Sequence, residues 1–296
     1  MSKVLLGDVA VEHKETCKGS KDGYPIVGLE HLVPEEITLT AWGEGSENTF
    51  TKMFRKGNVL FGRRRAYLKK AAVAPFDGIC SGDITVIEAK PDRILPELLP
   101  FIIQNDALFD FAVGKSAGSL SPRVKWEHLK NFEFELPDMD KQKELAALLW
   151  AMDDTKKSYQ KLIAATDELV KSQFMEQFGA IDSEGSFTRK QWKDVLKIVN
   201  GRDYKPIADP DGQYPVYGSG GLMGRATDYL CPEHTVVVGR KGTIDKPFVV
   251  NEKFWNVDTA FGVVPNQGVL HYLYLFWYCK QLDFKKLNKA STLPST

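Results

Sequence analysis

The sequence predicts a mixed α/β (α+β) protein in which two similar globular domains are joined by one long helix. Residues 138–178 contain neither Gly nor Pro and have apolar residues three and four positions apart, which is a helical pattern. On either side lie short β-branched and aromatic runs bounded by Gly and Pro, which are typical of strands. Several short motifs of the first part recur in the same order in the last part.

The first domain, residues 1–137, has the pattern of a mixed strand and helix domain. Apolar residues at helical spacing predict a helix over 96–111, and a loop rich in Gly and Ser follows at 114–123. Residues 126–136 close the domain and lead into the long helix. The segments predicted to be strands are 24–29, 59–62 and 84–88.

The long helix is predicted to start near Asp138 and to end at Gly179. A helix of this length is about 60 Å long, several times the usual globular helix. Two interpretations remain open: a core helix of one domain, or a rigid spacer with a coiled-coil seam. The residues predicted to pack against a partner helix are Leu145, Leu148, Met152, Tyr159, Leu162 and Leu169. The charges expected to be solvated on the opposite face are Asp153, Lys156, Lys157, Lys161, Asp167 and Lys171.

After a polar linker, the pattern of the first domain begins again. The matching segments are 24–28 with 214–218, 59–64 with 236–241, Asp83 with Asp258, 98–111 with 270–284, and 115–122 with 288–295. Five matches in the same order predict two copies of one domain, and the period is too long for a solenoid. The expected domains are therefore 1–137 and 180–296, with 138–179 as the spacer helix.

The second copy is expected to be incomplete at its C-terminus. The first copy continues past its Gly/Ser loop into the long helix, whereas the second ends at Thr296 inside the matching loop. We therefore expect no second long helix in this chain. The seam of 138–178 would then need a partner from elsewhere, and a second copy of the chain is one option.

Composition limits the possible functions. The net charge is zero and the pI is about 7.0, so only a local charge cluster can argue for nucleic acid. The four cysteines are scattered without zinc spacing, which favours a reduced, cytoplasmic location. The N-terminus lacks the apolar core of a signal peptide, and the run 269–279 is too short to cross a bilayer. We expect no membrane association, no metal and no cofactor.

Residues 51–76 form a local charge cluster, with eight Lys or Arg and no acid. Three of these residues, 63–65, follow a predicted strand. On a strand their side chains would point to opposite faces, but in a loop they could converge on phosphates or guanine edges. A solvated basic hairpin is the alternative. The similar basic turn at 239–242 favours two equivalent contacts with a repeating polymer such as duplex DNA.

Catalytic interpretations have less support in the sequence. Asp77 or Asp83 followed by Glu88 and Lys90 resembles the carboxylate and lysine set of metal nucleases, but such sets recur by chance. The corresponding residues of the second copy, 263–265, include no acid or base. The five histidines do not pair with a nucleophile or with metal-ligand spacing. The Gly/Ser segment 218–221 is predicted to be a turn, and no S-adenosylmethionine signature is present.

The layout of domain, long helix and repeated domain resembles the DNA-specificity subunit of type I restriction-modification systems. The local motifs also fit: LGDV at 6–9 with WKDV at 192–195, GYPIVG with QYPVYG, VLFGRR with VVVGRK, and LPDMDKQKELAALL before and within the long helix. The resemblance covers nearly the whole chain.

The resemblance implies a non-catalytic protein in which each globular domain is a target recognition domain reading one half of a bipartite DNA site. In this family two long helices pack antiparallel, set the distance between the readers and dock methyltransferase subunits. Motor-nuclease subunits then join the complex. The expected partners are therefore double-stranded DNA, methyltransferase and motor-nuclease subunits, and a second copy of the chain through the spacer helix.

The residues expected to contact DNA lie in the basic turns and the Gly/Ser loop of both copies. They are Arg63, Arg64, Arg65, Tyr67, Lys69, Lys115, Ser119, Arg123, Tyr217, Ser219, Arg225, Arg240 and Lys241. Two other function classes stay open at this point. One is a nuclease or methyltransferase that acts alone, and the other is a helical scaffold that binds only proteins.

Overall fold

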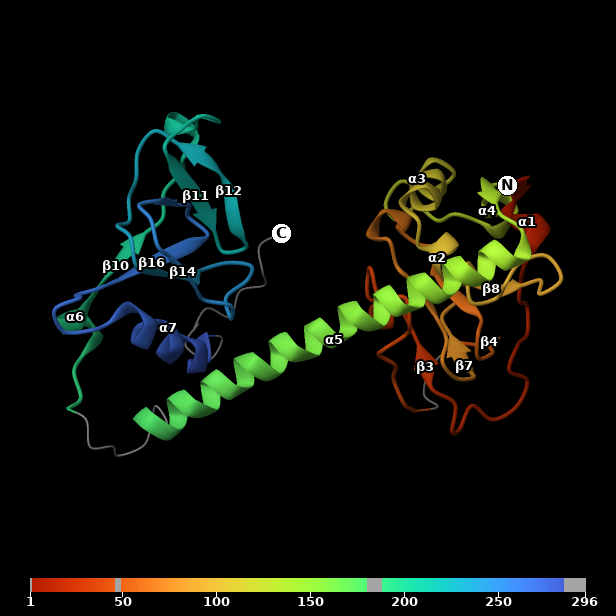
Figure 1. The fold of residues 1–296 in the computed structure, drawn as a ribbon, viewed down its shortest axis with the longest axis horizontal. Helices are drawn as coiled ribbons and strands as arrows, with labels where there is room; N and C mark the ends of the chain where they lie inside the picture. Colours follow the sequence, from red (N-terminus) through yellow and green to blue (C-terminus); the bar gives the residue numbers. More distant parts are fainter. Residues whose placement is uncertain (1, 46–48, 180–187, 285–296) are drawn as a thin grey trace. The chain divides into compact units, whose positions relative to one another are not determined.

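The structure, a computed structural model, describes residues 2–45, 49–179 and 188–284 (Figure 1). The chain divides into two compact units, unit 1 (residues 1–160) and unit 2 (161–296), and the boundary falls inside the long helix α5 (Met139–Phe178). Within the described residues, no helix is both long enough and apolar enough to span a membrane. All four cysteines are free thiols.

Unit 1 contains two sheets packed against each other. The first has the antiparallel order β2 (Ala10–Glu12), β8 (Ile84–Ala89), β5 (Val59–Gly62) and β6 (Ala71–Val73). The second has the order β3 (Ile26–Val27), β7 (Gly78–Cys80) and β4 (Lys52–Phe54). Because side chains alternate along a strand, Val59 and Phe61 of β5 join the core on the helical side, whereas Leu60 joins the core between the sheets.

Helices cover the other face of the first sheet. The short elements of unit 1 are α1 (Leu6–Val9), η1 (Leu29–His31), η2 (Ala66–Leu68), α2 (Leu99–Ile103), α3 (Asp106–Gly114) and α4 (Trp126–Leu129). The helix predicted over 96–111 is in fact two, because the Asn105 side chain caps α3 by accepting from the Ala107 N–H at 2.9 Å. Strand β1 (Ser2–Leu5) pairs with β9 (Glu133–Leu136), so the closing segment returns to the N-terminus.

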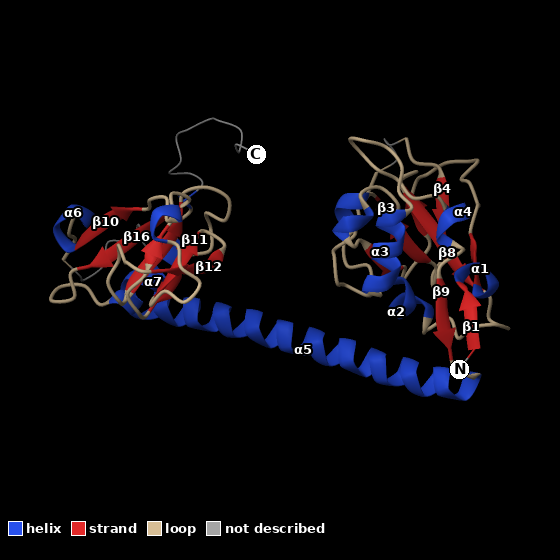
Figure 2. Cartoon of the chain, turned by 90° about the horizontal axis from the view of Figure 1, so that it is seen from above, coloured by secondary structure: helices blue, strands red, loops and turns tan. Residues whose placement is uncertain are grey.

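Unit 2 has the same construction. Its first sheet has the order β10 (Leu196–Asn200), β16 (Ala260–Pro265), β13 (Thr235–Gly239) and β14 (Phe248–Val250). Its second has the order β12 (Gly221–Ala226), β11 (Tyr214–Gly218) and β15 (Trp255–Asn256). The helical elements are α6 (Trp192–Val195), η3 (Lys205–Ile207) and α7 (Tyr272–Gln281). Helix α7 lies beside the first sheet (Figures 1 and 2). Leu275 and Cys279 of the helix share one buried core cluster with Val236 and Val238 of β13.

The two units therefore repeat one topology, which confirms the predicted duplication. The four-stranded sheets have strands in the same chain order, and each second sheet contains a parallel pair, β3 with β7 and β11 with β15. They differ in the third strand, since β4 pairs with β7 but β12 pairs with β11. The predicted counterpart of the Gly/Ser loop, at 288–295, lies outside the described residues.

The N-terminal half of α5 packs against unit 1. Asp138 caps the helix by accepting from the Lys141 N–H at 3.0 Å, as its residue type suggested. The buried Gln142 accepts from the Leu95 N–H at 2.8 Å. Trp150 donates to the Glu97 carbonyl at 2.9 Å and meets Phe101 edge to face. These contacts hold the first turns of α5 to the core of unit 1.

The prediction that the charged face of α5 is solvated was wrong for Asp153 and Lys157, two of its six residues. Asp153 has only 4% of its side chain exposed and pairs with Lys157 at 2.6 Å. Lys156 donates to the Glu35 carbonyl at 2.7 Å, and Lys157 reaches the Thr38 hydroxyl at 3.3 Å. At Lys156 and Lys157 the helix therefore packs on polar groups of unit 1.

The C-terminal turns of α5 pack against α7 within unit 2. The buried Phe174 lies 5.2 Å from Tyr274, measured between ring centroids, and Phe178 lies 5.1 Å from the same ring. Gly179 follows in the left-handed conformation, with φ of 79°, and ends the helix as predicted.

Candidate nucleic-acid interface

The basic turn of unit 1 begins where β5 ends. The Arg63 N–H donates to the Asp83 carbonyl at 3.0 Å, and the Arg63 carbonyl accepts from the Val124 N–H at 3.0 Å. These hydrogen bonds extend β5 by one residue, Arg63, which bonds to a neighbouring segment on each of its two sides. Three segments therefore meet at one place: the turn after β5, the turn before β8 and the end of the Gly/Ser loop.

Asp83 is the centre of this meeting point. Arg123 donates to its carboxylate from Nε at 2.6 Å and from Nη2 at 3.2 Å. Arg64 Nη1 lies 3.6 Å from Asp83 Oδ2, and the same guanidinium donates from Nη2 to the Ser121 hydroxyl at 3.0 Å. The hydrogen bond from Arg123 lowers the pKa of Asp83 and raises that of Arg123. We call these four residues the Asp83 cluster.

The Asp83 cluster fastens the Gly/Ser loop. Ala117 and Arg123 exchange both backbone hydrogen bonds, at 3.0 and 2.9 Å, which closes residues 118–122 into a small loop. The Arg65 N–H donates to the Pro122 carbonyl at 2.8 Å. The Gly/Ser loop, which contains residues predicted to contact DNA, is therefore held at its base by backbone hydrogen bonds and at its side by arginine side chains.

The predicted DNA contacts of unit 1 differ in how free their side chains are. Arg65, Lys115 and Ser119 are exposed, and neither Arg65 nor Lys115 pairs with an acid among the described residues. Tyr67 is 55% exposed on η2. Lys69 pairs with Asp106 at 2.5 Å, and that hydrogen bond raises its pKa.

Replacing Asp83 with Asn should destabilise unit 1 by about 1 kcal/mol at pH 7, because the charge-assisted hydrogen bonds from Arg123 and the ion pair with Arg64 are lost. The folded-state pKa of Asp83 is lowered, so its contribution is present above the unfolded value of about 3.9 and is lost as the pH falls through the folded pKa. Chemical unfolding at pH 7 and pH 2 should show a difference from wild type only at pH 7.

Glu133→Gln is the control for the Asp83 substitution. It removes an acid from the exposed Lys3–Glu133 pair, in which both side chains are more than half exposed. Its unfolding curve should match that of the wild-type protein at both pH values, since exposed pairs contribute little. A difference between Asp83→Asn and wild type that persists at pH 2 would contradict the electrostatic explanation.

In unit 2 the candidate residues meet around Thr259. The Arg240 and Lys241 N–H groups donate to the Thr259 carbonyl at 2.8 and 3.2 Å. The Ser219 N–H donates to the Thr259 hydroxyl at 3.4 Å. The turn 218–221, a hairpin between β11 and β12 as predicted, therefore lies beside the basic turn after β13.

The pairing register makes Thr259, and not Asp258, the structural counterpart of Asp83. Gly62 pairs with Ile84 and Gly239 pairs with Ala260, so the residues that precede the second strand are Asp83 and Thr259. The sequence match with Asp258 was therefore wrong by one position. The consequence is electrostatic, since a neutral residue replaces the carboxylate that holds two arginines in unit 1.

Arg240 and Lys241 are exposed, and neither forms an ion pair within the described part of the chain. The Arg240 guanidinium lies 5.7 Å from the centre of the Phe261 ring. By contrast, Arg225 donates to the Gly212 and Gln213 carbonyls at 2.6 and 2.8 Å. Arg240 and Lys241 are thus the side chains of this turn that are available to an anion.

Tyr217 packs inside unit 2. Its ring centroid lies 5.7 Å from that of Phe248 and 5.6 Å from that of Phe254, and burial raises the pKa of its hydroxyl. Tyr217 and Arg225 were both predicted to contact DNA, and the structure places their side chains in contacts within unit 2.

The predicted partner-facing residues of α5 form an exposed stripe. Leu148, Met152, Tyr159, Leu162 and Leu169 are each 58–63% exposed. With Thr155 and Thr166 they occupy alternating spacings of four and three, which are the a and d positions of one heptad frame. Leu145, at the next a position, instead packs against the core of unit 1. We call the five exposed residues the α5 seam.

The nuclease-like residues are each engaged in separate contacts. Asp77 pairs with Arg55 at 2.9 Å, Glu88 bonds His13 at 2.7 Å, and Lys90 donates to the Gly7 carbonyl at 2.7 Å. Across the described ranges, no three His, Cys, Asp or Glu side chains are grouped to hold a metal. The arrangement does not assemble the carboxylate and lysine set that the sequence spacing suggested.

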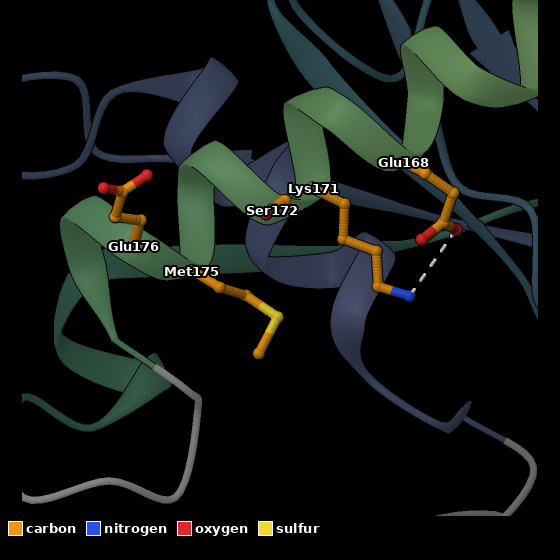
Figure 3. Close-up of a pocket in the computed structure, with 5 residues that line it drawn as sticks. All are labelled: Glu168, Lys171, Ser172, Met175 and Glu176. Atoms are coloured by element: carbon orange, nitrogen blue, oxygen red, sulfur yellow. Dashed lines mark ion pairs between the residues drawn. The ribbon is translucent and has the colours of Figure 1, made fainter.

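One open depression lies on α5 near its C-terminal end (Figure 3). Its lining residues all come from the helix: Glu168, Lys171, Ser172, Met175 and Glu176. Lys171 and Glu168 form an ion pair at 3.8 Å across it. A hollow on the side of one helix provides a surface for packing rather than an enclosed site for chemistry.

Comparison with known proteins agrees with this geometry. The sequence profile of the type I restriction modification DNA specificity domain matches residues 3–165 and again residues 186–296. The chain belongs to the type I restriction-modification DNA specificity family. The family profile matches the chain twice, and this agrees with the repeated topology of the two units.

Individual relatives of this specificity-family chain are distant. The EcoDI specificity subunit of Escherichia coli is 26% identical over 168 residues, which are 55% of this chain and 34% of that protein. The chain thus matches about a third of the length of this curated relative. The type I S subunit of M. genitalium has the same fold, with a TM-score of 0.60 and 12% identity over 98% of this chain and 79% of that one. HsdS from Thermoanaerobacter tengcongensis aligns with a TM-score of 0.47 and 18% identity, covering 99% and 81% of the two chains.

Sequence reasoning missed three features of the specificity-family fold that matter for the site. It did not identify Asp83 as the partner of Arg123, because the two residues are 40 positions apart. It aligned Asp83 with Asp258 rather than with Thr259, because the alignment compared residue types and not strand register. It also did not single out Leu120, which the structure leaves 89% exposed within the Gly/Ser loop.

Proposed function

We propose that this chain is the non-catalytic DNA-recognition subunit of a type I restriction-modification complex. In this proposal each unit reads one half of a bipartite duplex target. The observation that carries it is the basic turn that follows the third strand of the same sheet in both units, next to a second loop that approaches it. Exposed arginines and lysines at such turns can contact phosphates and guanine edges.

The proposal gives α5 two roles. A continuous helix of this length can set the distance between two half-sites, since each residue adds about 1.5 Å. The α5 seam would pack against a second long helix, for which the heptad spacing and exposed apolar side chains are suited. A second copy of this chain can supply that helix. Methyltransferase subunits would then dock on the paired helices, and motor-nuclease subunits would complete the complex.

The test is reconstitution of the full chain with the methyltransferase subunit encoded beside it. The expected result is methylated adenines at one bipartite sequence, with tighter DNA binding by the complex than by the chain alone at the same salt concentration. Equal affinities with and without the methyltransferase would contradict the docking role. Cleavage or methylation of DNA by the purified chain alone, given metal or S-adenosylmethionine, would favour the enzyme alternative.

A further inference from the structure

Leu120 is the most exposed large apolar side chain of the described residues, at 89%. Single exposed leucines are common on protein surfaces and need no functional explanation. The position of Leu120, however, does require a functional explanation. It lies at the apex of the five-residue loop that the Ala117–Arg123 pair closes, and that loop is fastened to the Asp83 cluster.

The loop is built to hold its apex in one place. Arg64 donates to the Ser121 hydroxyl from both Nε and Nη2, at 3.3 and 3.0 Å. Pro122 restricts the backbone directly after Ser121, and Gly118 takes a φ of 113° that other residues rarely adopt. A loop ordered before binding loses little conformational entropy when it binds. Leu120 is thus presented on a prepared support rather than on a free strand of chain.

The charge around the apex indicates the kind of partner. Arg65 bonds the loop through its backbone, and Lys115 lies at the start of the same loop. Both side chains are exposed, and neither has an acidic partner in the described part of unit 1. An apolar tip on a loop whose base carries two cations without acidic partners suits a polyanion with apolar edges behind its charges. Duplex DNA has this character, with phosphates outside and base edges in the grooves.

We propose that Leu120 is an apolar base-contacting residue of unit 1. Its side chain enters a groove and packs against base edges, while Arg65 and Lys115 hold the flanking phosphates. Apolar side chains read thymine methyl groups in the major groove and insert between base steps in the minor groove. The inference rests on the proposed function, since it assigns one residue of unit 1 to base recognition.

The test uses the full chain and a duplex that wild-type protein selects from a pool with a randomised core. Leu120→Ser should bind this duplex roughly tenfold more weakly, the size of one lost base contact. Its affinity for a scrambled duplex should stay at the wild-type value. The dependence of affinity on salt should also be unchanged, because no charge is removed. Leu120→Met should restore binding to the selected duplex.

The control is Val269→Ser, which removes another exposed apolar side chain, 51% exposed, from unit 2. It should bind both duplexes as the wild-type chain does. Thermal unfolding of the Leu120 variants should coincide with wild type, since Leu120 buries almost nothing in the fold.

Three outcomes would overturn the inference alone. Leu120→Ser could discriminate the two duplexes as well as wild type does, or it could change the salt dependence. It could also lose only its assembly with the methyltransferase, which would make the loop a protein contact. A complex of the wild-type chain with its methyltransferase that retains neither duplex would instead sink the proposed function, and this inference with it.

Discussion

Leu162→Lys is expected to abolish the dimerisation that pairing of two α5 seams would produce. The proposal pairs the α5 seam of two copies, and Leu162 lies at a d position near the middle of that seam. Burying one leucine contributes about 2 kcal/mol, and a two-fold dimer loses two. The dimer should therefore weaken by about 4 kcal/mol, roughly a thousandfold, before the cost of burying lysine is added. Sedimentation equilibrium of both proteins measures the effect.

Gln160→Lys is the matched control, since Gln160 is exposed on α5 and lies outside the a and d positions. This variant should remain dimeric. Helix content by circular dichroism should be equal in all three proteins, because Leu162 is already 60% exposed in the single chain. A wild-type protein that is monomeric at high concentration would contradict pairing between copies. Equal dimerisation of Leu162→Lys would place the contact elsewhere.

The double variant Arg240→Gln and Lys241→Gln should lose most of the DNA affinity contributed by unit 2. Each phosphate contact changes the slope of log K against log salt by about 0.9. Losing two contacts should reduce the slope by about 1.8 and weaken binding roughly fiftyfold at 0.1 M salt. The measurement is a titration of labelled duplex at four salt concentrations.

Lys193→Gln with Lys197→Gln removes the same charge from the opposite end of β16, where β10 begins. Its slope should stay within about 0.5 of the wild-type value, because these residues lie outside the proposed contact surface. If the slope of log K against log salt falls by the same amount in both double variants, DNA binding depends on total charge. The assignment of phosphate contacts to the basic turn is then wrong. If neither changes, unit 2 does not hold phosphates through Arg240 and Lys241.

Much of the fold could be predicted because its signals are local. The absence of Gly and Pro and the helical period predicted α5, and Asp138 and Gly179 predicted its ends. Strand β5 has the bounds predicted for it, 59–62. The predicted helix over 96–111 was not correct as a single element, because the cap at Asn105 divides it. A cap of this kind depends on one side chain accepting a hydrogen bond from the backbone N–H two residues further on.

The candidate site could be predicted only in part. The basic turns were readable because Gly-Arg-basic motifs occur in order in both copies, and the structure brings Ser219, Arg240 and Lys241 to Thr259. Residue type alone did not distinguish an available cation from an engaged one. Arg240 is unpaired in the described part of unit 2, whereas Arg123 is held by a carboxylate 40 positions away.

The sequence by itself determined the duplication, the long helix and the basic turns, because periodicity, capping residues and repeated motifs act over a few neighbouring positions. Only the tertiary structure decided which charges are available. Asp83 pairs with two arginines in unit 1, and strand register puts the neutral Thr259 at the same position in unit 2. The physical reason is that a charge is set by what lies within a few ångströms of it, and strand pairing brings together residues far apart in the chain.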